Sequence, residues 1–248
     1  MELKQILDVK KGSIISIAGA GGKSSLMYSL AEELKPQNKC LVTTTTKIFL
    51  PDSTQYNYMA IGSEQFHKLK LMKESGVYVY GSSVSQEQKL IGIACEDVMD
   101  CKDYFDYILI EADGSKRKPI KGWNNNEPVI CGCTSVTVGI LSIESLGKEI
   151  NEENVHRAEE FLKLTNSNLN DKITIEHYVS LIFHPRGLFK NSLGEKILFI
   201  NKVENLQQQQ MAELLCSNIR TKNQKIGMLD KIIMGSLKLK HYKIQRND

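Results

Sequence analysis

A glycine-rich stretch close to the N-terminus places the tightest constraint on what this chain can fold into. Residues 19–25 read Gly-Ala-Gly-Gly-Lys-Ser-Ser, after a mostly β-branched run at 13–17 and before leucines at helical spacing, Leu26, Leu30 and Leu34. The pattern predicts a buried strand, a tight loop and a helix. Glycines let successive backbone N–H groups face one point, and a helix start carries partial positive charge, so we expect a phosphate-binding loop.

The residues predicted to bind a nucleotide in this loop are Gly19, Ala20, Gly21, Gly22, Lys23, Ser24 and Ser25. Lys23 is expected to reach the terminal phosphates and act in catalysis, and the Ser24 hydroxyl is expected to bind Mg²⁺. A full Walker A pattern has glycine at the position of Ile17, so only the shorter Gly-x-x-Gly-Lys-Ser core is present, which resembles the loop of Mur-type amide ligases. The dinucleotide-binding pattern fails, because its third glycine is replaced by Ser24 and the next strand ends in threonines rather than an acid.

An acidic motif follows a second apolar run. Residues 107–110 lead into Glu111-Ala112-Asp113, the Walker B arrangement of a strand that ends in carboxylates. The two acids alternate with Ala112, so they point to the same side if the strand continues that far. We predict that Ser24, Glu111 and Asp113 bind Mg²⁺ and that the two acids also serve in catalysis by activating water. Sequence alone does not separate these roles.

Three further pairs of residues are candidates for binding an anion or a substrate. The run 43–46 is all threonine at the end of a predicted strand, and the carboxyl ends of parallel strands share one edge of a sheet, which brings the run close to the loop. The basic run 116–118 follows the acids, and a His-Arg pair opens a helix predicted from residue 156. The alternatives are an ordinary strand edge, a solvated loop and a surface pair. The candidate residues are Thr45, Lys47, Lys116, Arg117, His156 and Arg157.

Several of these motifs together resemble the YqeC family. They are the loop 19–25, the threonine run with Lys47, the stretch Glu-Ala-Asp-Gly-Ser-Lys at 111–116, Asn-Glu-Pro-Val-Ile at 126–130 and Val-His-Arg-Ala at 155–158. The resemblance covers most of the chain, and the 111–116 stretch is its most distinctive part. It implies an accessory role in the maturation of a selenium-dependent molybdenum hydroxylase, with that enzyme or its cofactor as a partner.

A later motif bears on the choice of base. Strand 196–200 is followed by Asn201-Lys202-Val203-Glu204, which resembles the Asn-Lys-x-Asp motif of GTPases with glutamate in place of aspartate. We predict that Asn201, Lys202 and Glu204 contact the base. A carboxylate accepts hydrogen bonds from both guanine N–H groups, but the longer glutamate leaves ATP and GTP both open.

Length and composition complete the fold prediction. The 248 residues, 41% apolar and 25% charged, are typical of a soluble globular protein, and the alternation of strands and helices predicts a doubly wound, mostly parallel α/β sheet of the P-loop NTPase type. We expect one domain over residues 1–248, with the option of a smaller C-terminal subdomain from about residue 150. Local patterns also predict a turn-like segment at 51–62, pairing of 89–93 with a strand at 76–81, and closing strands at 225–228 and 232–235.

Composition also excludes some classes of function. No apolar run is long enough to span a bilayer and the N-terminus lacks a secretory apolar core, so we expect a cytoplasmic protein that does not bind membranes. In that compartment the six cysteines are expected to be free thiols. A net charge of +3 is too small to indicate nucleic-acid binding.

The sequence therefore predicts a nucleoside triphosphate-binding accessory protein that uses Mg²⁺ and either ATP or GTP, most simply as an NTPase. Phosphoryl transfer depends on positioning and charge neutralisation, which suits the residues above. Two alternatives stay open: a nucleotide-gated protein that delivers a cofactor without significant turnover, and a ligase or kinase resembling the Mur-type enzymes.

Overall fold

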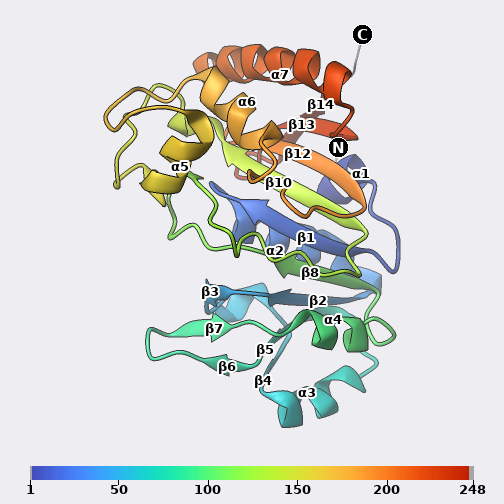
Figure 1. Ribbon diagram of the computed structural model, residues 1–248. Coiled ribbons are helices and arrows are strands. Elements are labelled where there is room, and N and C mark those ends of the chain that lie inside the picture. The colour runs from blue at the N-terminus through green and yellow to red at the C-terminus, as the bar shows by residue number, and fades with distance from the viewer. Residues whose placement is uncertain (1, 246–248) are drawn as a thin grey trace.

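One large sheet runs through the molecule (Figure 1). The computed structural model describes residues 2–245; Met1 and residues 246–248 lie outside it. The strands of the large sheet within that range are β1 (Ile14–Gly19), β2 (Lys39–Thr44), β4 (Tyr58–Ile61), β5 (Gly76–Gly81), β8 (Tyr107–Glu111), β10 (Val136–Ser142), β12 (Glu195–Asn201), β13 (Lys231–Ser236) and β14 (His241–Ile244).

The order of these nine described strands is β14-β13-β12-β10-β1-β8-β2-β5-β4. All neighbours are parallel except β13 and β14, which are antiparallel. The strands β1, β8 and β10 therefore end at the same edge, with β1 between the other two. The predicted mostly parallel α/β sheet is confirmed, and it includes strands from both sides of residue 150.

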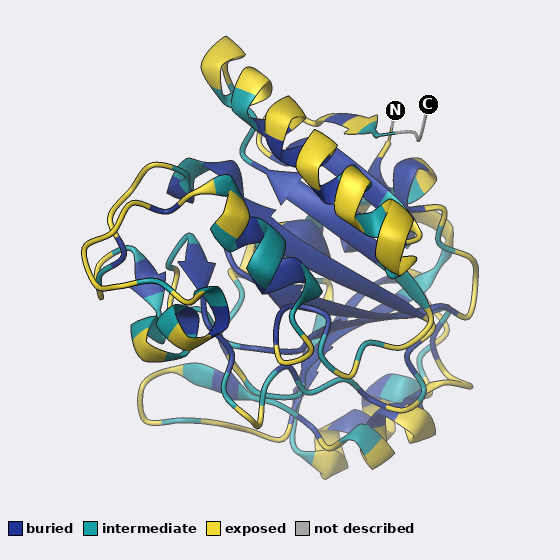
Figure 2. Ribbon diagram, turned by 45° about the horizontal axis from the view of Figure 1, so that its top comes forward, coloured by how far each residue is buried: buried dark blue, intermediate teal, exposed yellow. Residues whose placement is uncertain are grey.

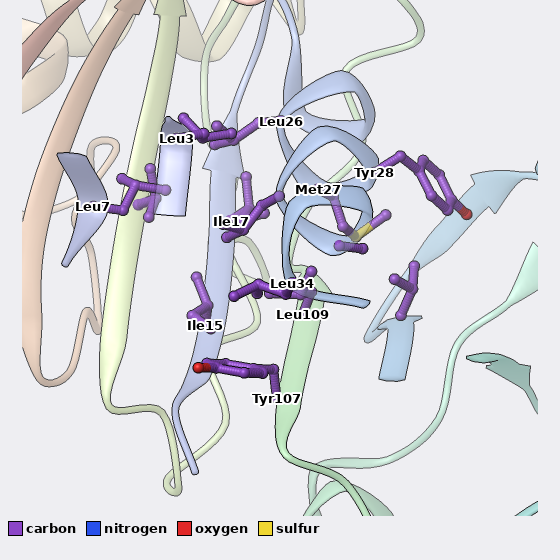
Figure 3. Packing of buried hydrophobic residues seen from close by; sticks show 14 of the residues in the cluster. Leu3, Leu7, Ile15, Ile17, Leu26, Met27, Tyr28, Leu34, Tyr107 and Leu109 are labelled. Atoms are coloured by element: carbon purple, nitrogen blue, oxygen red, sulfur yellow. The ribbon is translucent and has the colours of Figure 1, made fainter. Parts of the chain in front are cut away.

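Helices cover both faces of the sheet. They are α1 (Leu3–Leu7), α2 (Lys23–Leu34), α3 (Ser63–Lys70), α4 (Cys95–Cys101), α5 (Ala158–Thr165), α6 (Ile175–Phe183) and α7 (Leu206–Ile226). Successive side chains of a strand point to opposite faces. Ile15 and Ile17 accordingly pack with α1 and α2 (Figure 3), whereas Ala18 belongs to the core under α6 and α7. The central strands of the large sheet are buried and the helices expose their outer sides (Figure 2).

Two small sheets and three 3₁₀ turns complete the secondary structure of residues 2–245. One small sheet is antiparallel and contains β3 (Lys47–Phe49), β6 (Ser83–Val84) and β7 (Lys89–Ile91). The other pairs β9 (Ile120–Lys121) with β11 (Val155–His156) in parallel. The turns are η1 (Lys35–Gln37), η2 (Ser53–Gln55) and η3 (Ile143–Ser145). Because β3 begins three residues after β2 ends, the first small sheet lies beyond the carboxyl end of β2.

Three local predictions are wrong. Residues 89–93 do not pair with β5, because β2 and β4 already occupy both of its edges; β7 pairs with β3 and β6 instead. The segment 51–62 is not only turns, since it contains the edge strand β4. Residues 225–228 form no strand: Lys225 and Ile226 end α7, and Gly227 caps the helix in a left-handed conformation with φ 69°.

The expectation that all cysteines are free is also wrong. Cys95, at the start of α4, is joined to Cys131 by a disulfide, with the two Cα atoms 5.0 Å apart. The tertiary fold brings these two cysteines together across 36 positions of sequence, and neither the cellular compartment nor the local sequence predicts that proximity. Cys40, Cys101, Cys133 and Cys216 are free.

No helix within residues 2–245 combines the length and the apolar character needed to cross a bilayer.

Candidate functional site

The predicted glycine loop, residues 19–25, lies between the end of β1 and the first turn of α2. Gly19, Gly21 and Gly22 all have positive φ, at 113°, 84° and 143°. A Cβ on Gly21 would lie 2.4 Å from the Ser142 Cβ, and one on Gly22 would lie 2.3 Å from the Asn201 amide nitrogen. Only glycine satisfies both the conformation and the space at these positions.

Lys23 turns back over the loop and meets the two predicted acids. Its side chain is 2% exposed, and its Nζ donates a hydrogen bond of 2.7 Å to the Gly19 carbonyl. The same Nζ lies 3.6 Å from Glu111 Oε1 and 3.4 Å from Asp113 Oδ1. The structure thus brings together the lysine and both acids, which the sequence separates by almost 90 residues.

Glu111 ends β8 and faces the first turn of α2. The Ser24 hydroxyl donates a 2.7 Å hydrogen bond to its Oε2. Burial raises the pKa of Glu111, and the nearby Lys23 and the Ser24 hydrogen bond only partly oppose this effect. Glu111 is therefore an acid whose charge is poorly compensated by the protein alone, as expected of a group that faces a ligand or cation.

Asp113 has a different environment. Both of its carboxylate oxygens accept from the Gly19 N–H at 3.1 Å, and Oδ2 also accepts from Trp123 Nε1 at 2.7 Å. Burial alone would raise the pKa of Asp113, but Lys121 and Lys23, helped by these hydrogen bonds, hold it below its usual value. Asp113 stays ionised and fixes the start of the glycine loop.

Behind Asp113 lies a buried chain of alternating charges. Lys121 is fully buried, and its Nζ lies 3.1 Å from Asp113 and 2.8 Å from Glu127, and donates to the Gly114 carbonyl. Arg157 Nη2 lies 3.0 Å from the other oxygen of Glu127. Sequence reasoning named Arg157 but missed Lys121 and Glu127. Such a network fixes geometry, because each charge is costly to leave unpaired.

A cavity of about 1100 Å³ opens above the glycine loop. Among the described residues, its lining includes eight lysines and arginines but only two glutamates, so it suits a polyanion. The cationic residues are Lys23, Lys47, Lys89, Lys116, Arg117, Lys118, Arg157 and Lys202, and the acids are Glu111 and Glu127. Of the predicted site residues, Gly21, Gly22, Ser24, Ser25 and His156 also line it.

The predicted residues Thr45, Asn201 and Glu204 do not line the cavity, and their side chains contact other parts of the chain. The Thr45 hydroxyl donates to the Val129 carbonyl at 3.0 Å. The Asn201 amide donates to the Gly21 carbonyl at 2.8 Å and accepts from the Leu237 N–H at 3.2 Å, so it supports the glycine loop.

Glu204 contacts Ser236 and Lys238, each at 3.3 Å. Base recognition by Asn201, Lys202 and Glu204 stays a prediction.

Among the cavity residues that the sequence analysis missed, two aromatic side chains bear on the chemistry of the site. Tyr28 lies on α2, and its hydroxyl is buried with no hydrogen-bond partner among residues 2–245. Burial, and then the neighbouring Glu111, raise the pKa of Tyr28, so its hydroxyl remains a donor. The spacing to Ser24 is a signal that could have found it, because residues i and i+4 share a helix face. Phe49 is the second, described below.

His156 is uncharged at neutral pH. Burial, followed by Lys121 and Arg157, lowers the pKa of His156 to about 4. Its neutral ring can donate one hydrogen bond and accept another but adds no charge to the cavity.

The oxygen donors at the loop are of the kind that bind a magnesium–phosphate complex. Residues 2–245 contain no group of three or more histidine, cysteine, aspartate or glutamate side chains able to hold a metal. Mg²⁺ is usually held by one or two protein oxygens together with substrate phosphates. The Ser24 hydroxyl and the Glu111 carboxylate, 2.7 Å apart, match that pattern.

Comparison with known proteins places this site within a family. The family model "YqeC protein" matches residues 15–159, a range that holds the glycine loop, both acids and the buried charge chain. A curated relative from Escherichia coli (strain K12), named "Uncharacterized protein YqeC", is 31% identical over 198 residues, which cover 78% of this chain and 77% of the relative.

Proposed function

This chain belongs to the YqeC family, and we propose that it is a magnesium-dependent nucleoside triphosphatase of the P-loop type. The observation that carries the proposal is the glycine loop, which closes on a buried lysine in contact with two acids, under a cavity with eight cationic residues. Glycines with positive φ, a lysine and a serine at a helix start form a cradle for phosphate oxygens.

The two acids are proposed to have separate roles. Glu111 and Ser24 would hold Mg²⁺ with the phosphates, since both line the cavity and the Glu111 carboxylate lies 2.7 Å from the Ser24 hydroxyl. The cation would neutralise charge on the phosphates. Asp113 is a positioning residue: it is fully buried and accepts from the Gly19 N–H, so it acts through the loop. Environments that push two carboxyl pKa values apart are typical of sites with divided roles.

The remaining residues would bind and orient the triphosphate. Lys23 would contact the terminal phosphates, and Lys202 lies at the side of the cavity towards β12, where the base is proposed to lie. Tyr28 offers a buried hydroxyl donor that has no partner within residues 2–245. The proposed substrate is ATP or GTP, as the sequence predicts.

The biological setting is proposed from the family resemblance described above. In that setting the protein would assist maturation of a selenium-dependent molybdenum hydroxylase, with the enzyme or its cofactor as partner.

Phosphate release under multiple turnover, with Mg²⁺ and either ATP or GTP, tests the activity. We expect Glu111→Gln to abolish release and the exposed control Glu64→Gln, on α3, to leave it unchanged. If the folded parent bound the triphosphates and released no phosphate, the hydrolysis proposal would be wrong, and a binding protein without turnover would replace it.

A further inference from the structure

The cavity offers more space and charge than a triphosphate on the glycine loop uses. Its volume of about 1100 Å³ is above the roughly 300–1,000 Å³ typical of a site for one small ligand. Five of its eight cationic residues (Lys47, Lys89, Lys116, Arg117 and Lys118) come from β3, β7 and the loop after β8, not from the glycine loop. Lys89 is paired with Glu87 at 2.5 Å, but Lys47, Lys116, Arg117 and Lys118 make none of the ion pairs found within residues 2–245. A magnesium-bound triphosphate on the glycine loop would leave most of the charge of these four residues uncompensated.

The part of the cavity lining contributed by β3 includes an exposed aromatic ring. Phe49, the last residue of β3, is 47% exposed and lines the cavity. The Arg117 guanidinium lies 4.1 Å from the centre of its ring, and Lys89 Nζ lies 5.6 Å from it. A large exposed aromatic side chain between cations is suited to stacking with a flat, negatively charged partner.

The loop that carries Arg117 is held in an uncommon conformation. Lys116 and Arg117 have φ of 47° and 61°, so two consecutive residues with a Cβ adopt the left-handed region. That conformation is disfavoured for such residues and tends to persist where function requires it. Both side chains line the cavity.

The strand order separates this part of the cavity wall from the proposed base side. Lys202 follows β12, two strands from β1 on one side, whereas Phe49 follows β2, two strands from β1 on the other side. Glu111, at the end of β8, lies between the glycine loop and this wall. The proposed magnesium site, and with it the terminal phosphate, would therefore face Phe49.

We propose that the outer wall, formed by Phe49, Lys89 and residues 116–118, binds a second ligand: a flat aromatic compound that carries a phosphate or carboxylate group. The ring would stack on Phe49, and its anionic group would be held by the basic side chains. This inference rests on the proposed function, because the second ligand is placed beside the terminal phosphate of a bound triphosphate.

Binding of 1-naphthyl phosphate to the full chain tests the proposal, in the presence of saturating Mg²⁺ and a non-hydrolysable triphosphate. Ligand-observed NMR, which detects millimolar affinity, should show binding to the parent. Inorganic phosphate, which lacks the naphthyl ring, and 1-naphthol, which lacks the charge, should each bind at least tenfold more weakly than 1-naphthyl phosphate. Phe49→Ala and Arg117→Ala should each weaken it about tenfold, equal to about 1.4 kcal/mol.

The matched control is Tyr104→Ala. Tyr104 is also a partly exposed ring, with Lys70 Nζ 4.7 Å from its centre, but it lies outside the cavity lining. The Tyr104→Ala variant should therefore bind 1-naphthyl phosphate as tightly as the parent does. Equal losses in Tyr104→Ala and Phe49→Ala would overturn the assignment of the site.

Three other results would overturn the inference. The triphosphate could displace 1-naphthyl phosphate, or the parent could bind the triphosphate and show no binding of the probe. Phe49→Ala could weaken ATP or GTP without weakening tripolyphosphate, which would assign the ring to the base. Failure of the proposed function gives a different result from failure of this inference, because no triphosphate then binds to the parent. Binding of 1-naphthyl phosphate can still be measured in that case on the chain without nucleotide.

Discussion

Two neutral amides, Asp113→Asn and Glu111→Gln, should have very unequal effects on the free energy of unfolding although the residues are close in sequence. Asp113 has only donors around its carboxylate: the Gly19 N–H, Trp123 Nε1, Lys121 and Lys23. An asparagine must turn its NH₂ towards some of these donors, and it leaves Lys121 and Lys23 each with one acid fewer. Removal of one partner from a buried ion pair costs about 3–5 kcal/mol.

Glu111 is expected to contribute much less than Asp113 to the free energy of unfolding. Its hydrogen bond comes from a serine hydroxyl, which can turn to accept from the glutamine NH₂, and its nearest cation contact is 3.6 Å. Burial already raises the pKa of Glu111, so the ionised form is penalised and an uncharged amide avoids that penalty. We expect Glu111→Gln to change the free energy of unfolding by less than about 1 kcal/mol.

Urea unfolding at pH 7.5 without nucleotide measures the change in the free energy of unfolding for both variants. An equal dependence of this free energy on urea concentration indicates that the substitutions leave the unfolded states unchanged. A loss of about 3–5 kcal/mol for Asp113→Asn is a large share of the roughly 5–15 kcal/mol typical of a domain. If that variant does not fold, Trp123→Phe replaces it: it removes one hydrogen bond to the Asp113 charge and should cost about 1.5–3 kcal/mol. Equal stability losses for the Glu111 and Asp113 variants, or no loss for the Asp113 and Trp123 variants, would refute the division of roles.

Three further predictions concern individual side chains. Tyr28→Phe should leave the free energy of unfolding unchanged or raise it, because the hydroxyl is buried without a partner in residues 2–245. The same substitution should weaken triphosphate binding, measured by calorimetry, about two- to tenfold. A loss of stability with unchanged affinity would contradict a role of the hydroxyl in ligand binding. For His156 the folded pKa of about 4 lies below the usual 6.5, so the unfolded chain binds the extra proton between those values. The contribution of His156 to stability is therefore lost as pH falls from 6.5 to 4. In urea titrations, the free energy of unfolding of the parent minus that of His156→Gln should decline over that pH window. A difference that does not change with pH would contradict burial of a neutral His156 ring. Glu204→Ala should reduce the preference for GTP over ATP in competition binding if the predicted base contact exists, and an unchanged ratio would remove that role.

The glycine loop and Glu111 were predictable because their signals are local. A strand, three glycines, a lysine and a helix follow one another within about 20 residues, and the acid ends an apolar run. Parallel strands carry both to the same edge of the sheet, so their meeting needed only the fold class. The pairing of β8 with β1 then places Glu111 beside Ser24.

The buried charge chain could not be read in the same way. Lys121 and Glu127 lie in a segment without regular periodicity, and in a sequence they are indistinguishable from solvated surface charges. Their burial depends on Asp113 and Arg157, which reach them through the tertiary fold. The disulfide and the edge strand β4 were missed for a related reason, since each depends on neighbours that are distant along the chain.

The most direct test of the central claim is calorimetric titration of the parent protein with a non-hydrolysable triphosphate and Mg²⁺, alongside Lys23→Met and the exposed control Lys148→Met. Methionine keeps most of the volume of the lysine and removes a charge-assisted hydrogen bond of about 1.5–3 kcal/mol. The account predicts binding to the parent and to Lys148→Met, and affinity about ten- to a hundredfold weaker for folded Lys23→Met. Equal affinity for folded Lys23→Met and parent, or no binding to the parent, would contradict it.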